Sequence, residues 1–135
     1  MSKKTMWVAC AIIEQDDKIL AVQRSERMNL PLKWEFPGGK IKQGESPKQC
    51  VVREVSEELN LRIAVRQSLP SVTHDYDDFF VTLYPFTCAI VSGEITLYEH
   101  KALLWLSPHE LWSLDWVDAD FAILPTYCDL LNRHS

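Results

Sequence analysis

The chain has 135 residues, of which 47% are hydrophobic and 24% charged, the proportions of a globular domain in water. This length predicts a single domain, residues 1–135, with a hydrophobic core of ordinary size. The formal net charge of −5 argues against broad binding to nucleic-acid backbones, which requires a basic surface. No apolar run is long enough to span a membrane, and the short one near the N-terminus indicates a strand rather than a signal peptide.

The first part of the chain predicts a hairpin followed by a loop. Trp7–Ile13 and Lys18–Arg24 are β-prone runs, and the polar segment 14–17 between them indicates a tight turn. Ser25–Lys33 is expected to be a loop. Trp34–Phe36 then leads into a pair of glycines.

Residues 37–60 predict a loop followed by a helix. Ser46 is expected to cap the helix, Pro47 to occupy its first position, and Gln49 to complete a capping box. Asn60 suits the left-handed conformation in which helices commonly end.

The side chains of this helix fall into two groups. At about 100° per residue, Glu54, Glu57 and Glu58 lie within roughly a 100° arc. Arg53 precedes Glu57 by four residues and can pair with it. Glu54 and Glu58 repel each other, so we expect a cation, and hard oxygen ligands suit Mg²⁺ or Mn²⁺. The separate apolar stripe comprises Val51, Val52, Val55 and Leu59.

The second half of the chain is rich in predicted strands. Arg62–Val72 is expected to be extended, Thr73–Asp78 to form a polar turn, and Phe79–Val91 to form a long strand. Pro85 within that strand predicts an edge or a bulge.

The last forty residues or so predict a strand and two helices. Glu94–Leu97 is short and extended, and Ala102–Leu106 has the pattern of a buried strand. Ser107–Leu114 has a cap followed by proline and predicts a short helix. Asp118 or Asp120 is expected to start the final helix. The apolar side of that helix would comprise Phe121, Leu124, Leu130 and Leu131. The elements together predict a mixed sheet with helices on its faces, in the α/β (α+β) class.

The four cysteines lie far apart, without the spacing of a zinc site or a redox motif. Their apolar surroundings predict buried free thiols and a reducing, cytoplasmic compartment. They are Cys10, Cys50, Cys88 and Cys128.

The segment Gly39–Leu61 resembles the signature of the Nudix hydrolases, Gly-x5-Glu-x7-Arg-Glu-U-x-Glu-Glu-x-Gly-U, where U is a bulky apolar residue. Every specified position matches except Asn60, which replaces the second glycine. Since asparagine is the next-best residue for a left-handed helix end, we expect the chemistry to be intact. The resemblance implies the Nudix α/β/α sandwich with a mixed β-sheet.

Residues 34–40, with Gln23 and Arg24, extend the resemblance to MutT-type nucleoside triphosphate pyrophosphohydrolases. These enzymes cut between the α and β phosphates with water and divalent metal, and release the monophosphate and pyrophosphate. The implied metal ligands, with Mg²⁺ or Mn²⁺ as the cofactor, are the Gly38 carbonyl, Glu54, Glu57, Glu58 and Glu99. The alternative for Glu99 is an acidic residue in a surface turn.

The implied catalytic residues are Glu54, Arg53 and Glu57. Glu54, or an acid from another loop, would take the proton of the attacking water. Arg53 would orient the glutamates, and Glu45 would brace the loop from behind.

The resemblance also implies a substrate pocket built from Arg24, Glu35, Phe79 and Asp120. Arg24 would grip a phosphate, or else be a solvated residue at a strand end. Asp120 would read the edge of the base, or else cap the last helix. Stacking partners for the base, if not simply core residues, are Phe79, Tyr76 and Trp116. The four histidines lack metal-ligand spacing and are given no catalytic role; they are His74, His100, His109 and His134.

Two substrates remain open for this free-nucleotide enzyme. One is an oxidised purine triphosphate such as 8-oxo-dGTP, in a nucleotide-pool sanitising role that protects DNA, and this is the one we favour. The other is CTP, because Ala102–Pro108 and Ala119-Asp120 are also similar to the CTP pyrophosphohydrolase branch. Alternatives outside this group are a catalytically inactive nucleotide-binding regulator and a Nudix enzyme acting on dinucleotide, sugar-nucleotide or isoprenoid diphosphates.

Overall fold

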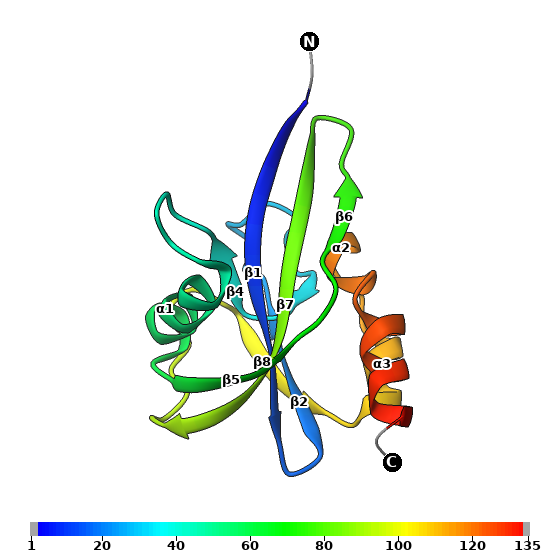
Figure 1. The fold of residues 1–135 in the computed structure, drawn as a ribbon. Coiled ribbons are helices and arrows are strands. Elements are labelled where there is room, and N and C mark those ends of the chain that lie inside the picture. Colours follow the sequence, from blue (N-terminus) through cyan, green and yellow to red (C-terminus); the bar gives the residue numbers. More distant parts are fainter. Residues whose placement is uncertain (1–2, 134–135) are drawn as a thin grey trace.

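The computed structural model describes residues 3–133, and within them it contains an eight-stranded mixed β-sheet. Two long strands, β1 (Lys4–Gln15) and β7 (Phe79–Ser92), run parallel along its centre (Figure 1). On its other side, β7 pairs antiparallel with β5 (Arg62–Ser68) and with β6 (Val72–Asp75).

The remaining strands carry the residues of the candidate site. β4 (Gly38–Lys40) pairs antiparallel with the middle of β1. β2 (Lys18–Gln23) follows β1 through the predicted hairpin. It is flanked by β3 (Trp34–Glu35) on one side and by β8 (Ala102–Leu106) on the other.

Helices cover both faces of the sheet, which confirms the predicted α/β/α sandwich. α1 (Pro47–Leu59) lies on one face. The other face carries the 3₁₀ helix η1 (Pro108–Ser113), α2 (Asp118–Phe121) and α3 (Leu124–Arg133). Figure 1 shows α1 to the left of the β1–β7 pair and α2 and α3 to its right.

The alternation of side chains along β1 divides the core into these two layers. Ala9, Ala11 and Ile13 pack against α1. Cys10 and Ile12 belong to the cluster that packs against α2 and α3. The apolar stripe predicted for α1 is correct, since Val51, Val55 and Leu59 are buried and Val52 packs against the same cluster.

Both ends of α1 are formed as predicted. The N–H of Gln49 donates to Ser46 Oγ (3.1 Å), and the N–H of Ser46 donates to Gln49 Oε1 (2.9 Å). Asn60 has a left-handed backbone with φ of 59°. Its own N–H donates to Ser56 O, and its side-chain amide donates to Glu94 O. Asparagine therefore replaces the expected glycine without distorting the helix end.

The prediction of a polar turn over Thr73–Asp78 is wrong. Val72–Asp75 forms the strand β6, and only the three residues after it make the turn to β7. Val72 packs against the core while Thr73 pairs with Thr82 across the sheet, so the segment alternates as a strand does. The extended run predicted over Arg62–Val72 is interrupted after Ser68, just before Pro70, where the chain passes from β5 to β6.

The segment predicted to be extended at Glu94–Leu97 does not join the sheet as a strand. Ile95 and Leu97 do pack against the α1 side of the core, as their alternation suggests. However, the N–H of Thr96 donates to Leu59 O at the end of α1. Because the neighbour of this segment is a helix end rather than a strand, no ladder forms.

The final helix is broken in two, because Pro125 in the first turn of α3 has no N–H to continue α2. Phe121 is therefore 45% exposed, contrary to its predicted place on the apolar side. Leu124 is buried and Leu130 and Leu131 pack on the core, as expected. The short helix before it is present at Pro108–Ser113 as a 3₁₀ helix.

Pro85 marks neither an edge nor a bulge. It lies inside β7, between the residues that pair with β6 and those that pair with β5, so the ladder on that side needs no donor from it. All four cysteines are free thiols, and Cys128 alone among them is only half-buried. No helix within residues 3–133 is long and apolar enough to cross a membrane. His134 lies outside the described residues.

Candidate active site

Two glycines of β4 lie in close contact with their neighbours, Gly38 with β1 and Gly39 with α1. Pairing of β4 with β1 places Gly39 against the Glu54 carboxylate, and a Cβ atom on Gly39 would lie 2.3 Å from Glu54 Cδ. A Cβ atom on Gly38 would lie 2.1 Å from the carbonyl oxygen of Ala9. The backbone contact requires glycine at position 38, whereas a larger residue at position 39 would displace the end of the Glu54 side chain.

Arg53 lies at the centre of the glutamate cluster. Its Nη1 donates to Glu54 Oε1 (2.8 Å) and to Glu57 Oε1 (3.1 Å). Its Nε and Nη2 donate to the two carboxylate oxygens of Glu45, at 2.6 and 3.0 Å. Nη2 also donates to Lys40 O, which belongs to β4. One guanidinium group thus joins the helix to the loop, as expected for a residue that orients the glutamates.

The carboxylate of Glu45 contacts both Arg53 and the backbone of the loop. Besides its two bonds from Arg53, its carboxylate accepts the N–H of Lys42 (3.0 Å). The Arg53 hydrogen bonds, followed by that of Lys42, lower the pKa of Glu45 to about 2. Glu45 is therefore ionised at neutral pH and acts as a fixed anchor for Arg53.

Glu58 differs from the other glutamates of the helix because it is largely buried. Its Oε1 accepts the N–H of Gly38 (3.1 Å), so the structure brings these two candidate ligands together. Burial, followed by the carboxylates of Glu35, Glu54 and Glu99, raises the pKa of Glu58 to about 8. Glu58 thus lies close to three further carboxylates, whose negative charge opposes its ionisation.

Arg24 and Glu35 pair with each other rather than standing alone. Arg24 Nη1 donates to Glu35 Oε1 (2.9 Å), and its Nε donates to Asn29 O (2.6 Å). The other oxygen of Glu35 lies 2.8 Å from His100 Nε2. The structure therefore places Arg24 in an ion pair, which excludes the alternative of a simply solvated strand-end residue.

His100 is the residue of this site that the sequence did not indicate. Its side chain is 1% exposed and stands between Glu35 and Glu58. A single histidine has no metal-ligand spacing that could mark it in the sequence. Its position just before the buried strand β8, directly after Glu99, was the signal available in the sequence.

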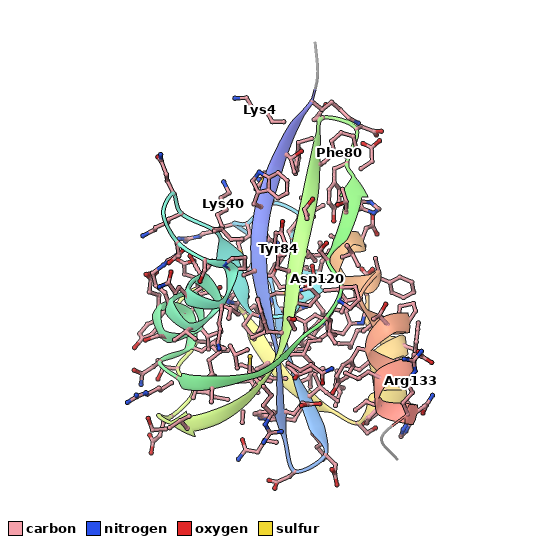
Figure 2. All side chains as sticks on the ribbon, in the orientation of Figure 1. Lys4, Lys40, Phe80, Tyr84, Asp120 and Arg133 are labelled. Atoms are coloured by element: carbon pink, nitrogen blue, oxygen red, sulfur yellow. The ribbon has the colours of Figure 1, made fainter. Side chains whose placement is uncertain are left out.

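Asp120 lies on the other side of the sheet from the glutamate loop. Figure 2 shows it beside β7, towards α2, whereas Lys40 lies on the side of α1. A bridge between Trp34 and Trp116 brings the two segments together, and Asp120 Oδ2 accepts the N–H of Phe36 (2.8 Å). The N-cap of α2 is Val117, so Asp120 is not a helix cap.

The carboxyl group of Asp120 is buried, with 6% of the residue exposed. Burial raises the pKa of Asp120 well above its ordinary value of 3.8, and the carboxylate of Glu35 raises it further. The Phe36 N–H and Arg24 act in the opposite direction and are outweighed. Burial therefore favours the protonated form of Asp120, in which the carboxyl group can donate a hydrogen bond.

Two of the three candidate stacking residues lie at the surface together. Tyr76 and Phe79 stack with ring centroids 5.5 Å apart, and both are half-buried. The hydroxyl of Tyr76 accepts the N–H of Ala119, the neighbour of Asp120 (2.9 Å). Trp116 instead is buried against Phe36 in the core, so it is not available to a base.

A family model of the NUDIX domain matches residues 3–127. The chain belongs to the Nudix family. The CTP pyrophosphohydrolase of Escherichia coli (strain K12) is 34% identical over 127 residues, which cover 94% of each chain. The 8-oxo-dGTP diphosphatase of the same organism is 30% identical over 105 residues, covering 77% of this chain and 81% of that one. The crystal structure of a MutT protein from Methanosarcina mazei Go1 has a TM-score of 0.84 at 27% identity, over 98% of both chains.

The carboxylate oxygens of the Nudix glutamates suit a divalent cation, but in this structure the side chains do not surround one common point. Within residues 3–133, no three His, Cys, Asp or Glu side chains converge on a point that could hold a metal. Arg53 holds Glu54 and Glu57, and 55% of the Glu57 side chain is exposed. Arg53 occupies only one oxygen of Glu54, so the other oxygen could bind a metal. Carboxylate and carbonyl oxygens are the donors that Mg²⁺ and Mn²⁺ prefer, and the negative charge around Glu58 favours such an ion.

A cavity of about 440 Å³ opens beside the glutamate site of this Nudix hydrolase. It is lined by Glu99 and Tyr98 on one side and by residues 25–28 on the other. Glu99 is exposed there, and its charge acts on Glu58, which places it near the other candidate ligands. A larger cavity, of about 700 Å³, lies at the β1–β2 turn and contains none of the candidate residues. The larger cavity is therefore not the one beside the candidate site.

Proposed function

We propose that this Nudix hydrolase is a Mg²⁺-dependent nucleoside triphosphate pyrophosphohydrolase that releases a monophosphate and pyrophosphate from a free nucleotide. The observation that carries the proposal is the buried Glu58, which lies against Gly38 with three further carboxylates acting on it. A divalent cation balances this charge, and its other coordination positions accept phosphate oxygens.

The residues of the chain divide the chemistry between them. Glu54, Glu57 and Glu58, with the Gly38 carbonyl and Glu99, are proposed to hold the metal. When bound, Mg²⁺ neutralises phosphate charge and lowers the pKa of a water molecule. Glu54 takes the proton of the attacking water, and Arg53, anchored by Glu45, keeps the helix and the loop in register. Arg24, oriented by Glu35, binds a phosphate oxygen.

Asp120 is proposed to select the base by offering one donor and one acceptor. A protonated carboxyl group is complementary to a base edge on which an acceptor and a donor are adjacent. The O6 and N7–H of 8-oxoguanine form such an edge, and so do the N3 and N4 amino group of cytosine. Unmodified guanine presents two acceptors, O6 and N7, at the same edge. Tyr76 and Phe79 lie nearby as a stacking surface.

The favoured substrate is an oxidised purine triphosphate such as 8-oxo-dGTP, which gives the enzyme a role in sanitising the nucleotide pool. CTP is the second candidate, because the chain matches the CTP pyrophosphohydrolase of E. coli over 94% of both lengths. The free thiols support a reducing, cytoplasmic setting for either reaction.

The experiment is a comparison of kcat/KM for 8-oxo-dGTP, CTP and dGTP with Mg²⁺, in the wild type and in Asp120→Asn. An amide keeps one donor and one acceptor at every pH, whereas the carboxyl loses its donor when it ionises. We expect dGTP to be the poorest substrate at neutral pH. Raising the pH until Asp120 ionises should lower kcat/KM for all three nucleotides in the wild type, because each loses the hydrogen bond from the carboxyl proton, and should have less effect in the variant. Equal kcat/KM values for dGTP and the two candidates would refute the proposed role of Asp120.

A further inference from the structure

The His100 imidazole connects the substrate side of the site to the glutamate side. Its Nε2 lies 2.8 Å from Glu35 Oε2, and its Nδ1 lies 3.7 Å from Glu58 Oε2. Among the residues that the structure describes, Nδ1 is the one buried side-chain nitrogen or oxygen atom without a hydrogen-bond partner. Buried polar atoms are nearly always paired, so an orphan nitrogen in a candidate active site calls for a functional explanation.

The backbone fixes where this ring stands. The N–H of Lys101 donates to Gln23 O at the end of β2, immediately before Arg24. β3 pairs with the same end of β2 and carries Glu35. The pairing of β3 and β8 with β2 thus holds His100 between β3 and α1. Its ring therefore has little freedom to turn away from Glu58.

A row of polar groups leads from Arg24 to Gly38 of β4, with one gap between His100 and Glu58. Arg24 donates to Glu35 at 2.9 Å, Glu35 contacts His100 at 2.8 Å, and Glu58 accepts the N–H of Gly38 at 3.1 Å. The side chains are one-fifth exposed or less, apart from Arg24 at 22%. Only the step from His100 to Glu58, at 3.7 Å, exceeds a hydrogen bond. A small rotation of the Glu58 carboxylate would close it.

We propose that His100 is a positioning residue for Glu58: its ring, with a proton on each nitrogen, donates Nε2–H to Glu35 and Nδ1–H to the Glu58 carboxylate once that carboxylate closes onto it, and so holds Glu58 in the orientation that binds the metal. The inference rests on the metal role proposed for Glu58. Groups that hydrogen-bond to a metal ligand fix its direction, and their loss typically weakens metal binding 10–100-fold. The same ring connects the metal ligand Glu58 to Arg24 through Glu35. The metal and the phosphate are thereby held at a fixed distance from each other.

The test is Mn²⁺ binding without nucleotide, with free Mn²⁺ measured by electron paramagnetic resonance. Three variants separate the two nitrogens: in His100→Asn the amide lies near the position of Nδ1, in His100→Gln it reaches that of Nε2, and His100→Leu has neither. We expect His100→Leu and His100→Gln to weaken Mn²⁺ binding by about 10–100-fold. The Mn²⁺ affinity of His100→Asn should stay within about threefold of the wild-type value, because this variant keeps a polar group facing Glu58. The matched control, His109→Leu, alters an exposed histidine and should change nothing.

The order of the variants distinguishes positioning from a purely structural role. If His100 served only to pair with Glu35, His100→Gln would retain Mn²⁺ binding and His100→Asn would lose it. That result would overturn the inference. Wild-type affinity in His100→Leu would overturn it as well. If the wild type itself bound no Mn²⁺, the metal role of Glu58, and with it the proposed function, would fail instead.

A measurement on the unaltered protein covers the case in which the variants do not fold. Nitrogen-15 chemical shifts of the histidine rings can be followed as Mg²⁺ is added to the wild type. We expect the shift of His100 Nδ1 to change as the site fills, because it gains its hydrogen bond, while that of His109 stays constant. An unchanged Nδ1 shift at saturating Mg²⁺ would refute the closure onto Glu58.

Discussion

Glu58→Gln is the substitution that most directly probes the buried charge of the site. The amide has the shape of the carboxyl and keeps an oxygen for the N–H of Gly38. It removes only the ability to ionise. The variant therefore separates the cost of a buried negative charge from the packing of the helix against the loop.

The structure sets the size and the sign of the effect. The pKa of Glu58 rises from 4.5 to about 8, a change of about 3.5. At roughly 1.4 kcal/mol for each tenfold change, ionising Glu58 in the folded protein costs on the order of 5 kcal/mol. Between about pH 4.5 and pH 8 the folded state holds a proton that the unfolded state has lost. The contribution of Glu58 to the free energy of unfolding therefore falls as the pH rises through this window.

The assay is urea unfolding of the metal-free wild type and of Glu58→Gln at several pH values from 4 to 9. We expect similar stability at pH 4 and a difference that grows above pH 5, until the variant is the more stable by several kcal/mol at pH 9. Asp120 is present in both proteins, so its contribution cancels in the difference. Saturating Mg²⁺ should stabilise the wild type most at high pH, because it binds the ionised carboxylate. Parallel pH profiles of the two metal-free proteins would refute the reasoning.

Two further substitutions test the close approaches and the helix end. Gly39→Ala should fold normally but lose on the order of 100-fold in kcat/KM, because its Cβ displaces the mobile Glu54 carboxylate. Gly38→Ala should instead destabilise the fold by roughly 1–3 kcal/mol, because its Cβ meets the backbone of β1. Thermal unfolding and kcat/KM measured on both variants check this contrast, and a loss of stability in Gly39→Ala alone would contradict it. Asn60→Ala should cost roughly 1–2 kcal/mol in urea unfolding, whereas Asn60→Gly should change stability by less than about 1 kcal/mol, since only alanine is strained at φ of 59°.

Where the sequence predicted the fold well, the signal was local. The capping box of Ser46 and Gln49, the apolar stripe of α1 and the left-handed Asn60 each depend on residues only a few positions apart. The corrected elements depend on distant partners. Val72–Asp75 becomes a strand because β7 lies beside it, and Glu94–Leu97 does not because its neighbour is the end of α1.

The site shows the same division. The Arg53 contact to Glu57 follows from helical spacing, and the motif indicated Glu45. The step from Glu35 to Glu58 through His100 joins three elements that are distant in the sequence. No periodicity or spacing rule could place that imidazole, because its position depends on the pairing of β2 with both β3 and β8.

The measurement that tests the central claim most directly is the identity of the phosphorus products. 8-oxo-dGTP and CTP would be incubated separately with Mg²⁺, with EDTA, and with the variant Glu57→Gln, and followed by phosphorus NMR. Glu57 is exposed, so its replacement should leave the fold intact while removing a metal ligand. The account predicts monophosphate and pyrophosphate with Mg²⁺, no reaction with EDTA, and a rate lower by several orders of magnitude in the variant. Diphosphate and inorganic phosphate as products, or saturable nucleotide binding without turnover, would contradict it.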